Sequence, residues 1–303
     1  MLFHLNCTHN CGIHILSEIL RHGNAGVDMF LFLSALGLCF SLEKNSIKQF
    51  ISIAWKRVLI PSVCLAIVQA LAVGAFRGCL TLDYVLRNGL LLSYWIDGTG
   101  LWYVSFIILL YALFPLIKKA DERTKHISSI FVMIAAEVIV LVNAFHPLPY
   151  IPTIEKAISR VPIFFCGLLA YPAVKANKPR RLLFLLGILF ALTAVLWVIR
   201  RRFDTESVSR ALLGAAGLSI MYTYTFLRER FGFDRLFKWL APIGAVSPEF
   251  YIWHLTFRDV WMAIPRLNAL PRYIIWAGVF AAGLAASFAS RALFEKLLKK
   301  RPA

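Results

Sequence analysis

Several ionisable side chains stand inside or at the ends of apolar stretches, where apolar packing does not explain them. His4 lies in the short apolar start of the chain, and Asp28 lies near the beginning of the next apolar run. Glu137 and His254 lie within later runs. An ionisable group inside a membrane span costs about 2.5–3.5 kcal/mol on insertion scales. Because a carboxylate can orient an imidazole and raise its basicity, His4 with Asp28 could supply general-base chemistry.

The same residues also have interpretations without chemistry. Asp28 could cap a helix that starts near Asn24, and His4 could be a structural histidine. Glu137 could be a buried carboxyl paired with a neighbouring helix. Arg258 and Asp259 are adjacent in one run, and they could form a local pair or an end of a helix. These alternatives stay open at the level of the sequence.

Histidines and cysteines alternate near the start of the chain, which raises the question of a metal. Their spacing matches neither paired C-x-x-C nor H-E-x-x-H, so we expect no metal site. The chain also lacks G-x-S-x-G, G-x-x-x-x-G-K-[ST] and G-x-G-x-x-G, which disfavours a serine hydrolase, a P-loop ATPase and a Rossmann dehydrogenase. The histidines and cysteines in question are His4, Cys7, His9, Cys11 and His14.

The composition predicts that these residues are held by membrane-spanning helices. The chain has 303 residues, of which 59% are hydrophobic and only 16% charged, and its mean hydropathy is +0.70. Soluble proteins carry about 25% charged residues. The net charge of +17 is spread over short clusters between apolar runs rather than over one basic face, so we expect a lipid bilayer as partner and no nucleic acid.

The long apolar runs predict an all-α, polytopic transmembrane bundle in a single domain over residues 1–303. Residues 1–5 are expected to be the end of a first helix, which makes ten helices in the complete fold. Residues 6–24 have apolar positions at helical spacing, typical of an amphipathic helix on the membrane surface. The nine expected long helices lie near 25–42, 58–76, 101–117, 127–146, 160–175, 182–199, 211–227, 247–264 and 273–294.

Lys and Arg alternate between the runs in a way that predicts orientation. Five segments are rich in them, whereas the loop 77–100 has only Arg77 and Arg87. The loop with Arg200–Arg202 and Arg210 departs from this alternation. The positive-inside rule favours the five basic segments and the C-terminus in the cytoplasm, with His4 and Asp28 near the outer face. The basic segments are 43–57, 118–126, 175–181, 228–246 and the tail from Lys296 to Arg301.

Several stretches resemble, in order, motifs of one family of membrane proteins. Residues 26–35, G-V-D-M-F-L-F-L-S-A, are similar to the G-V-D-L-F-F-x-L-S-G signature of the acyltransferase-3 family. Residues 56–61, K-R-V-L-I-P, resemble its R-x-x-R-I-x-P. Trp102 and Tyr103 with the residues to Pro115 resemble its W-F-L…Y…P. Residues 164–167, F-F-C-G, resemble its F-x-x-G, and 247–254, S-P-E-F-Y-I-W-H, resemble S-Y-x-x-Y-L-x-H.

The resemblance implies a ten-helix enzyme that transfers acyl groups, often acetyl from acetyl-CoA, to hydroxyls of sugars. His4 matches the family's first-helix histidine and is expected to act as the base, with Asp28 positioning it or the acceptor. Lys56 and Arg57 are expected to hold the phosphates of acyl-CoA, which is a substrate, so no cofactor is bound permanently. The family also carries an Arg eleven positions before that histidine; here it would fall before Met1, which predicts a truncated start or a fragment.

The expected acceptor is a cell-surface glycan or a lipid-linked sugar, and the expected location is a bacterial cytoplasmic (inner) membrane. A possible acceptor site or structural polar site comprises Glu137, Trp102, Tyr251 and His254. Three other functions compete. One is a transporter or flippase with Asp28, Glu137 and His254 as a polar path. The others are an inactive fragment of the same family and the unrelated membrane-bound O-acyltransferase fold.

Overall fold

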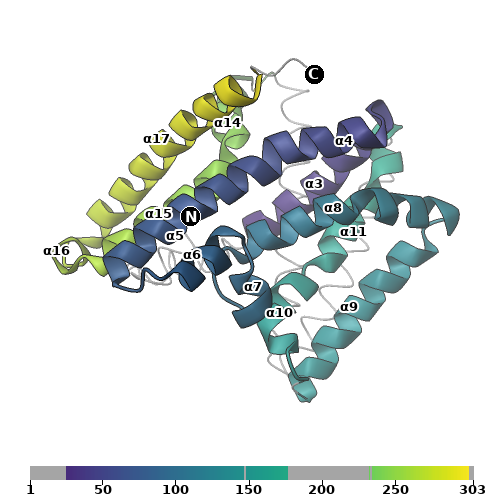
Figure 1. The fold of residues 1–303 in the computed structure, drawn as a ribbon. Helices are drawn as coiled ribbons and strands as arrows, with labels where there is room; N and C mark the ends of the chain where they lie inside the picture. The colour runs from purple at the N-terminus through teal and green to yellow at the C-terminus, as the bar shows by residue number, and fades with distance from the viewer. Residues whose placement is uncertain (1–24, 147, 177–231, 233, 300–303) are drawn as a thin grey trace. The chain divides into compact units, whose positions relative to one another are not determined.

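The structure is a computed structural model that describes residues 25–146, 148–176, 232 and 234–299 (Figure 1). Every element of secondary structure in these ranges is a helix, which confirms the all-α prediction. Among the described residues, five helical segments are long and apolar enough to cross a membrane, so the chain is an integral membrane protein. These segments are Gly26–Lys44, Ile47–Arg77, Trp102–Arg123, Ile151–Lys175 and Arg272–Leu298.

The helix positions follow the apolar runs closely. Two further predicted runs form shorter helices, α9 (Ile127–Phe145) and α15 (Ser247–Ala263). The predicted helices at 182–199 and 211–227 lie outside the described residues, as do the first-helix remnant 1–5 and the amphipathic segment 6–24.

The described residues divide into two compact units. The first, the α5 unit, comprises residues 52–105 and 234–299; the second, the α11 unit, comprises 25–51 and 106–176. The helix α8 (Trp102–Arg123) begins in the α5 unit and continues into the α11 unit. The single domain expected over 1–303 stays a prediction.

The α5 unit is built around three packed helices. The helix α15 packs against both α5 (Ile60–Arg77) and α17 (Arg272–Lys299). A Cβ on Gly278 of α17 would lie 2.6 Å from the Trp261 ring, so glycine permits this close approach. The smaller helices of the unit are the π-helical turn η2 (Trp55–Leu59), α6 (Leu82–Gly89), α7 (Ser93–Asp97), α14 (Asp234–Ala245) and α16 (Pro265–Asn268).

The α11 unit is held by α11 (Val161–Lys175), which packs against α3 (Ala25–Lys44) and α9. A Cβ on Gly167 would lie 2.4 Å from the Phe32 carbonyl oxygen, closer than any side chain can approach. Small residues allow membrane helices to pack backbone to backbone. The unit also contains α10 (Ile151–Ile158) and the first five residues of α4 (Ile47–Ala54).

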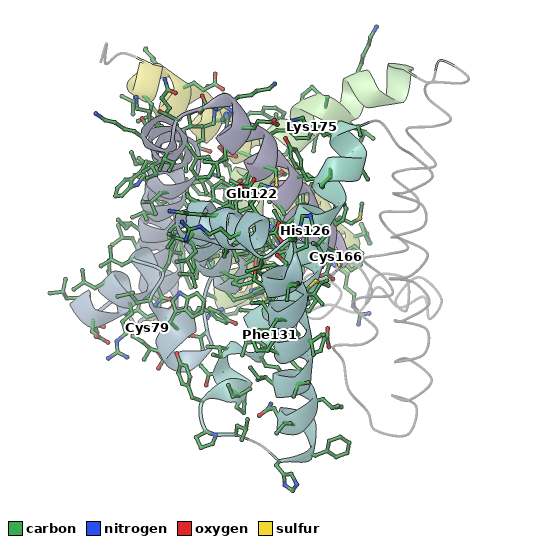
Figure 2. The ribbon with its side chains drawn as sticks, turned by 90° about the vertical axis from the view of Figure 1, so that its right-hand side faces the viewer. Cys79, Glu122, His126, Phe131, Cys166 and Lys175 are labelled. Atoms are coloured by element: carbon green, nitrogen blue, oxygen red, sulfur yellow. The ribbon has the colours of Figure 1, made fainter. Side chains whose placement is uncertain are left out.

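A polar clip joins α8 to α9 in the α11 unit. Asp121 is fully buried, and its carboxylate accepts a short hydrogen bond from the Ser129 hydroxyl and bonds the His126 ring at 2.9 Å. His126 has a φ of 74°, which turns the chain between the two helices (Figure 2). These hydrogen bonds give the buried carboxylate its partners and hold the turn between α8 and α9 in place.

Candidate functional site

Asp28 forms a buried ion pair in the α11 unit. It lies in the first turn of α3 and is 2% exposed, and Arg160, at the residue before α11, is 3% exposed. The Arg160 Nε lies 3.3 Å from the Asp28 Oδ1. Arg160 also donates from Nη1 to the Lys156 carbonyl oxygen at 2.9 Å. Since α3 begins at Ala25, Asp28 stands inside the helix rather than at its cap, and a buried cation balances its charge.

Sequence reasoning did not identify Arg160 as a site residue. It stands where an apolar run begins, a common place for an arginine at the end of a span. Its burial was not evident, because its partner lies far away in the chain, on α3. An Arg directly before Val161-Pro162 is the one local hint, since proline in the first turn indicates a helix start there.

Trp102, Tyr251 and His254 come together in the α5 unit through a residue that the site prediction omitted, Tyr103. The Tyr103 and Tyr251 rings meet edge to face with centroids 5.1 Å apart. The Tyr251 ring meets the His254 ring at 5.6 Å, and Trp102 contacts Tyr103 at 5.9 Å. Tyr94 adds a ring 6.4 Å from Trp102. We refer to these five residues as the aromatic cluster.

His254 is the ionisable member of the aromatic cluster. It is 2% exposed, and its Nδ1 lies 2.8 Å from the Phe250 carbonyl oxygen. A carbonyl can only accept, so Nδ1 carries the proton, and in the neutral ring Nε2 holds the lone pair. The ring is therefore oriented by its own helix, with the basic nitrogen on the other side.

Lys56 and Arg57 are exposed in the π-helical turn η2. Such turns are rare and frequently occur at functional sites. From Lys56 to Arg77 the helix continues without a break, which at about 1.5 Å per residue is roughly 30 Å, the thickness of a bilayer core. The two cations and the Arg77 end of α5 therefore lie at opposite ends of one span.

The remaining predicted residues are placed as follows. Glu137 is half-buried on α9 and makes no hydrogen bond or ion pair with any other described residue. Arg258 donates to the Asp259 carboxylate at 2.6 Å, which confirms the local pair. His4 lies outside the described residues. Within the described ranges, no group of three or more His, Cys, Asp or Glu is placed to hold a metal ion.

Comparison with known families decides the class of protein. The sequence model of the acyltransferase domain family matches residues 5–292. The chain belongs to the acyltransferase-3 family. The comparisons with curated proteins and with solved structures gave no significant match. The match confirms the resemblance and makes this chain a member of a family of membrane acyltransferases.

In this acyltransferase-3 chain, part of the motif pattern has a packing explanation. Gly167, the glycine of F-F-C-G, is the residue that lets α11 approach the α3 backbone. The F-x-x-G segment therefore helps to position α3, which carries Asp28. By contrast, the segments with Trp102 and His254 contribute side chains to one aromatic cluster.

Proposed function

We propose that the protein is a membrane O-acyltransferase that moves an acyl group, acetyl in the simplest case, from cytoplasmic acyl-CoA to a glycan hydroxyl. The acceptor is an extracytoplasmic surface glycan or a lipid-linked sugar. The observation that carries this proposal is the family match over residues 5–292. It is supported by two exposed cations at one end of a span and by the aromatic cluster, with its buried His254, in the same unit.

The proposed orientation follows from the charge pattern. The five basic segments and the C-terminus face the cytoplasm of a bacterial inner membrane. Lys56 and Arg57 then meet acyl-CoA at the inner face, where an ammonium and a guanidinium suit its phosphates. The Arg77 end of α5 faces outward, toward the acceptor.

The proposed reaction is a direct acyl transfer. His4 removes the proton from the acceptor hydroxyl, and the hydroxyl oxygen forms a bond to the thioester carbonyl carbon. The carbon–sulfur bond breaks, CoA leaves as a thiolate, and the proton ends on its sulfur. Asp28 positions His4 or the acceptor, and its charge is balanced by Arg160. A positioned base typically contributes about 10²–10⁴-fold to the rate.

Replacing the proposed base tests this function. His4→Ala is expected to lower acylation of the cell-surface glycan by about 10²–10⁴-fold, because the hydroxyl loses its proton acceptor. Alkali-released acetate from the glycan measures the reaction, normalised to the amount of protein in the membrane. His9→Ala in the same segment is the matched control and should retain activity. Wild-type acylation of the glycan by His4→Ala would show that His4 is not the base.

The donor site has a separate test. Lys56→Gln with Arg57→Gln is expected to raise the KM for acetyl-CoA by about 10–100-fold, since charge-assisted hydrogen bonds contribute about 1.5–3 kcal/mol. The KM for the acceptor should not change. Lys48→Gln, another exposed lysine before the π-helical turn, is the control. An unchanged KM for acetyl-CoA would show that Lys56 and Arg57 do not bind the donor and serve only as membrane anchors.

A further inference from the structure

A polar cavity of about 530 Å³ opens at the Arg77 end of α5, within the α5 unit. This volume is in the range of about 300–1,000 Å³ typical of small-molecule sites. Its walls come from the end of α5, from α6 and α7 with the loops around them, and from Asp259 of α15. The lining residues that carry the argument are Arg77, Asp83, Tyr84, Arg87, Asp97 and Asp259.

Local chain signals build this cavity. The helix α5 ends at Arg77 and is capped by Gly78, which has a φ of 69°. Thr81 caps α6 by accepting a hydrogen bond from the Tyr84 amide. Gly100 has a φ of 77°, and a Cβ there would lie 2.5 Å from the Ser93 hydroxyl, so only glycine fits. The segment is thus a defined wall rather than a loose loop.

Arg87 neutralises the carboxylates on one side of the cavity. Its Nε donates to the Asp83 carboxylate at 2.8 Å, and its Nη1 lies 3.8 Å from Asp97. The hydrogen bond that Arg87 donates to the Asp83 carboxylate raises the pKa of the Arg87 guanidinium above its ordinary value. Burial raises the pKa of the neighbouring Tyr84 phenol, which therefore remains an uncharged donor.

The other side of the cavity is neutralised in the same way. Asp259 accepts from Arg258 at 2.6 Å and lies 3.6 Å from the Arg77 Nη2. Three arginines therefore balance three carboxylates. A charged ligand would be repelled by the wall groups that carry its own sign of charge. An uncharged ligand rich in hydroxyls, by contrast, can donate hydrogen bonds to the carboxylates and accept them from the guanidinium groups.

The cavity and the aromatic cluster share elements of the α5 unit. Asp259 follows His254 by five residues on α15, about 7.5 Å along the helix axis. Two other lining residues, Ser93 and Gly100, are next or nearly next in the chain to Tyr94 and Trp102 of the cluster. The cavity and the aromatic cluster are therefore built on the same segments of the chain.

We propose that this cavity binds the acceptor, as an uncharged, hydroxyl-rich sugar unit, through the carboxylate and guanidinium groups of its wall. This inference rests on the proposed function, because it assigns the acceptor side of the reaction. It places the acceptor at the opposite end of the Lys56–Arg77 span from the cations proposed to bind acyl-CoA. The sugar hydroxyls form hydrogen bonds with the carboxylate oxygens and guanidinium N–H groups that the ion pairs of the wall do not use.

Cys79 is a natural reporter for the cavity, because it is exposed and lines it (Figure 2). In the full chain with Cys7→Ser, Cys11→Ser and Cys64→Ala, a membrane-impermeant charged maleimide added to intact cells is expected to alkylate Cys79. The same chain with Cys79→Ser should lose the labelling. Lys119→Cys, added to that background in a segment proposed to be cytoplasmic, should remain unlabelled from outside.

The ligand test uses the cells' own surface glycan, stripped of O-acyl esters by mild alkali, as the probe. This glycan is expected to slow alkylation of Cys79 at least five-fold, whereas polygalacturonate, which is charged, should not. Alkylation of Cys79 is expected to lower acyl transfer to the glycan at least ten-fold without changing the binding of acetyl-CoA.

Asp97→Asn is a second, milder variant, since Asp97 is exposed and folding should be unaffected. The KM for the glycan is expected to rise about five-fold, with the KM for acetyl-CoA unchanged. One outcome would overturn the cavity as acceptor site but leave the proposed function standing. In it, the unmodified protein transfers acyl groups, the glycan does not protect Cys79, and Asp97→Asn does not change the KM for the glycan. Protection of Cys79 without any acyl transfer would support the cavity and overturn the proposed function.

Discussion

Replacing Arg160 by methionine is expected to lower the free energy of unfolding by about 3–5 kcal/mol. The substitution removes the guanidinium that lies 3.3 Å from the Asp28 carboxylate, and both side chains are almost fully buried. Removing one partner of a buried ion pair leaves the other charge in a medium that solvates it poorly. Chemical unfolding in detergent micelles measures the effect. Arg123→Met, on an exposed part of α8, is the control and should change stability by less than about 0.5 kcal/mol.

The double variant Asp28→Leu with Arg160→Met separates structure from chemistry at this site. Apolar side chains of similar size can replace a buried ion pair with little cost, so the double variant should recover most of the lost stability. It should nevertheless fail to transfer acyl groups, because the proposed positioning carboxylate is gone. Recovery of both stability and acyl transfer would make Asp28 a structural residue only. Wild-type stability in Arg160→Met alone would contradict the buried pair itself.

Gly167→Val is expected to give no folded protein. A Cβ at this position would lie 2.4 Å from the Phe32 carbonyl oxygen and 2.9 Å from the Ala35 Cβ, so α11 and α3 would have to separate. Gly167→Ala should cost about 1–3 kcal/mol, the range for overpacking in a close-packed interior. Because Phe32 is one turn from Asp28, the displacement should also lower acyl transfer. Yield after detergent extraction and thermal unfolding measure the two effects.

Gly37→Ala is the matched control for this prediction. Gly37 lies on α3 as well, but an added Cβ there meets nothing within 4 Å. The variant should therefore fold and retain activity, because alanine enters a helix at less entropic cost than glycine. If Gly167→Ala were as stable as Gly37→Ala, the close contact between α11 and α3 would not be the reason for glycine at 167.

The helices themselves were predictable from the sequence because their cause is local. A span satisfies its own backbone hydrogen bonds and needs about 20 apolar residues, so the run of residue types marks it directly. The expected helices at 25–42, 127–146 and 247–264 begin at the residues where α3, α9 and α15 begin. The order of loose motifs along the chain likewise identified the family that the match over 5–292 confirms.

The partners of the site residues could not be predicted, because they are chosen by packing between helices. Nothing near Asp28 in the chain indicates that Arg160 balances its charge. Nothing near His254 in the chain indicates that Tyr103 contacts Tyr251 on the helix of His254 and so connects that helix to Trp102.

The polar cavity illustrates the same limit. The loop 77–100 was noted only for its few basic residues, but its fold brings Arg87 to two carboxylates and Arg77 to Asp259 of α15. The sequence by itself determined which segments span the membrane, because each span depends on its own residues. Only the tertiary structure decided which side chains meet, because a contact depends on how two distant helices pack and on the glycines that let them approach.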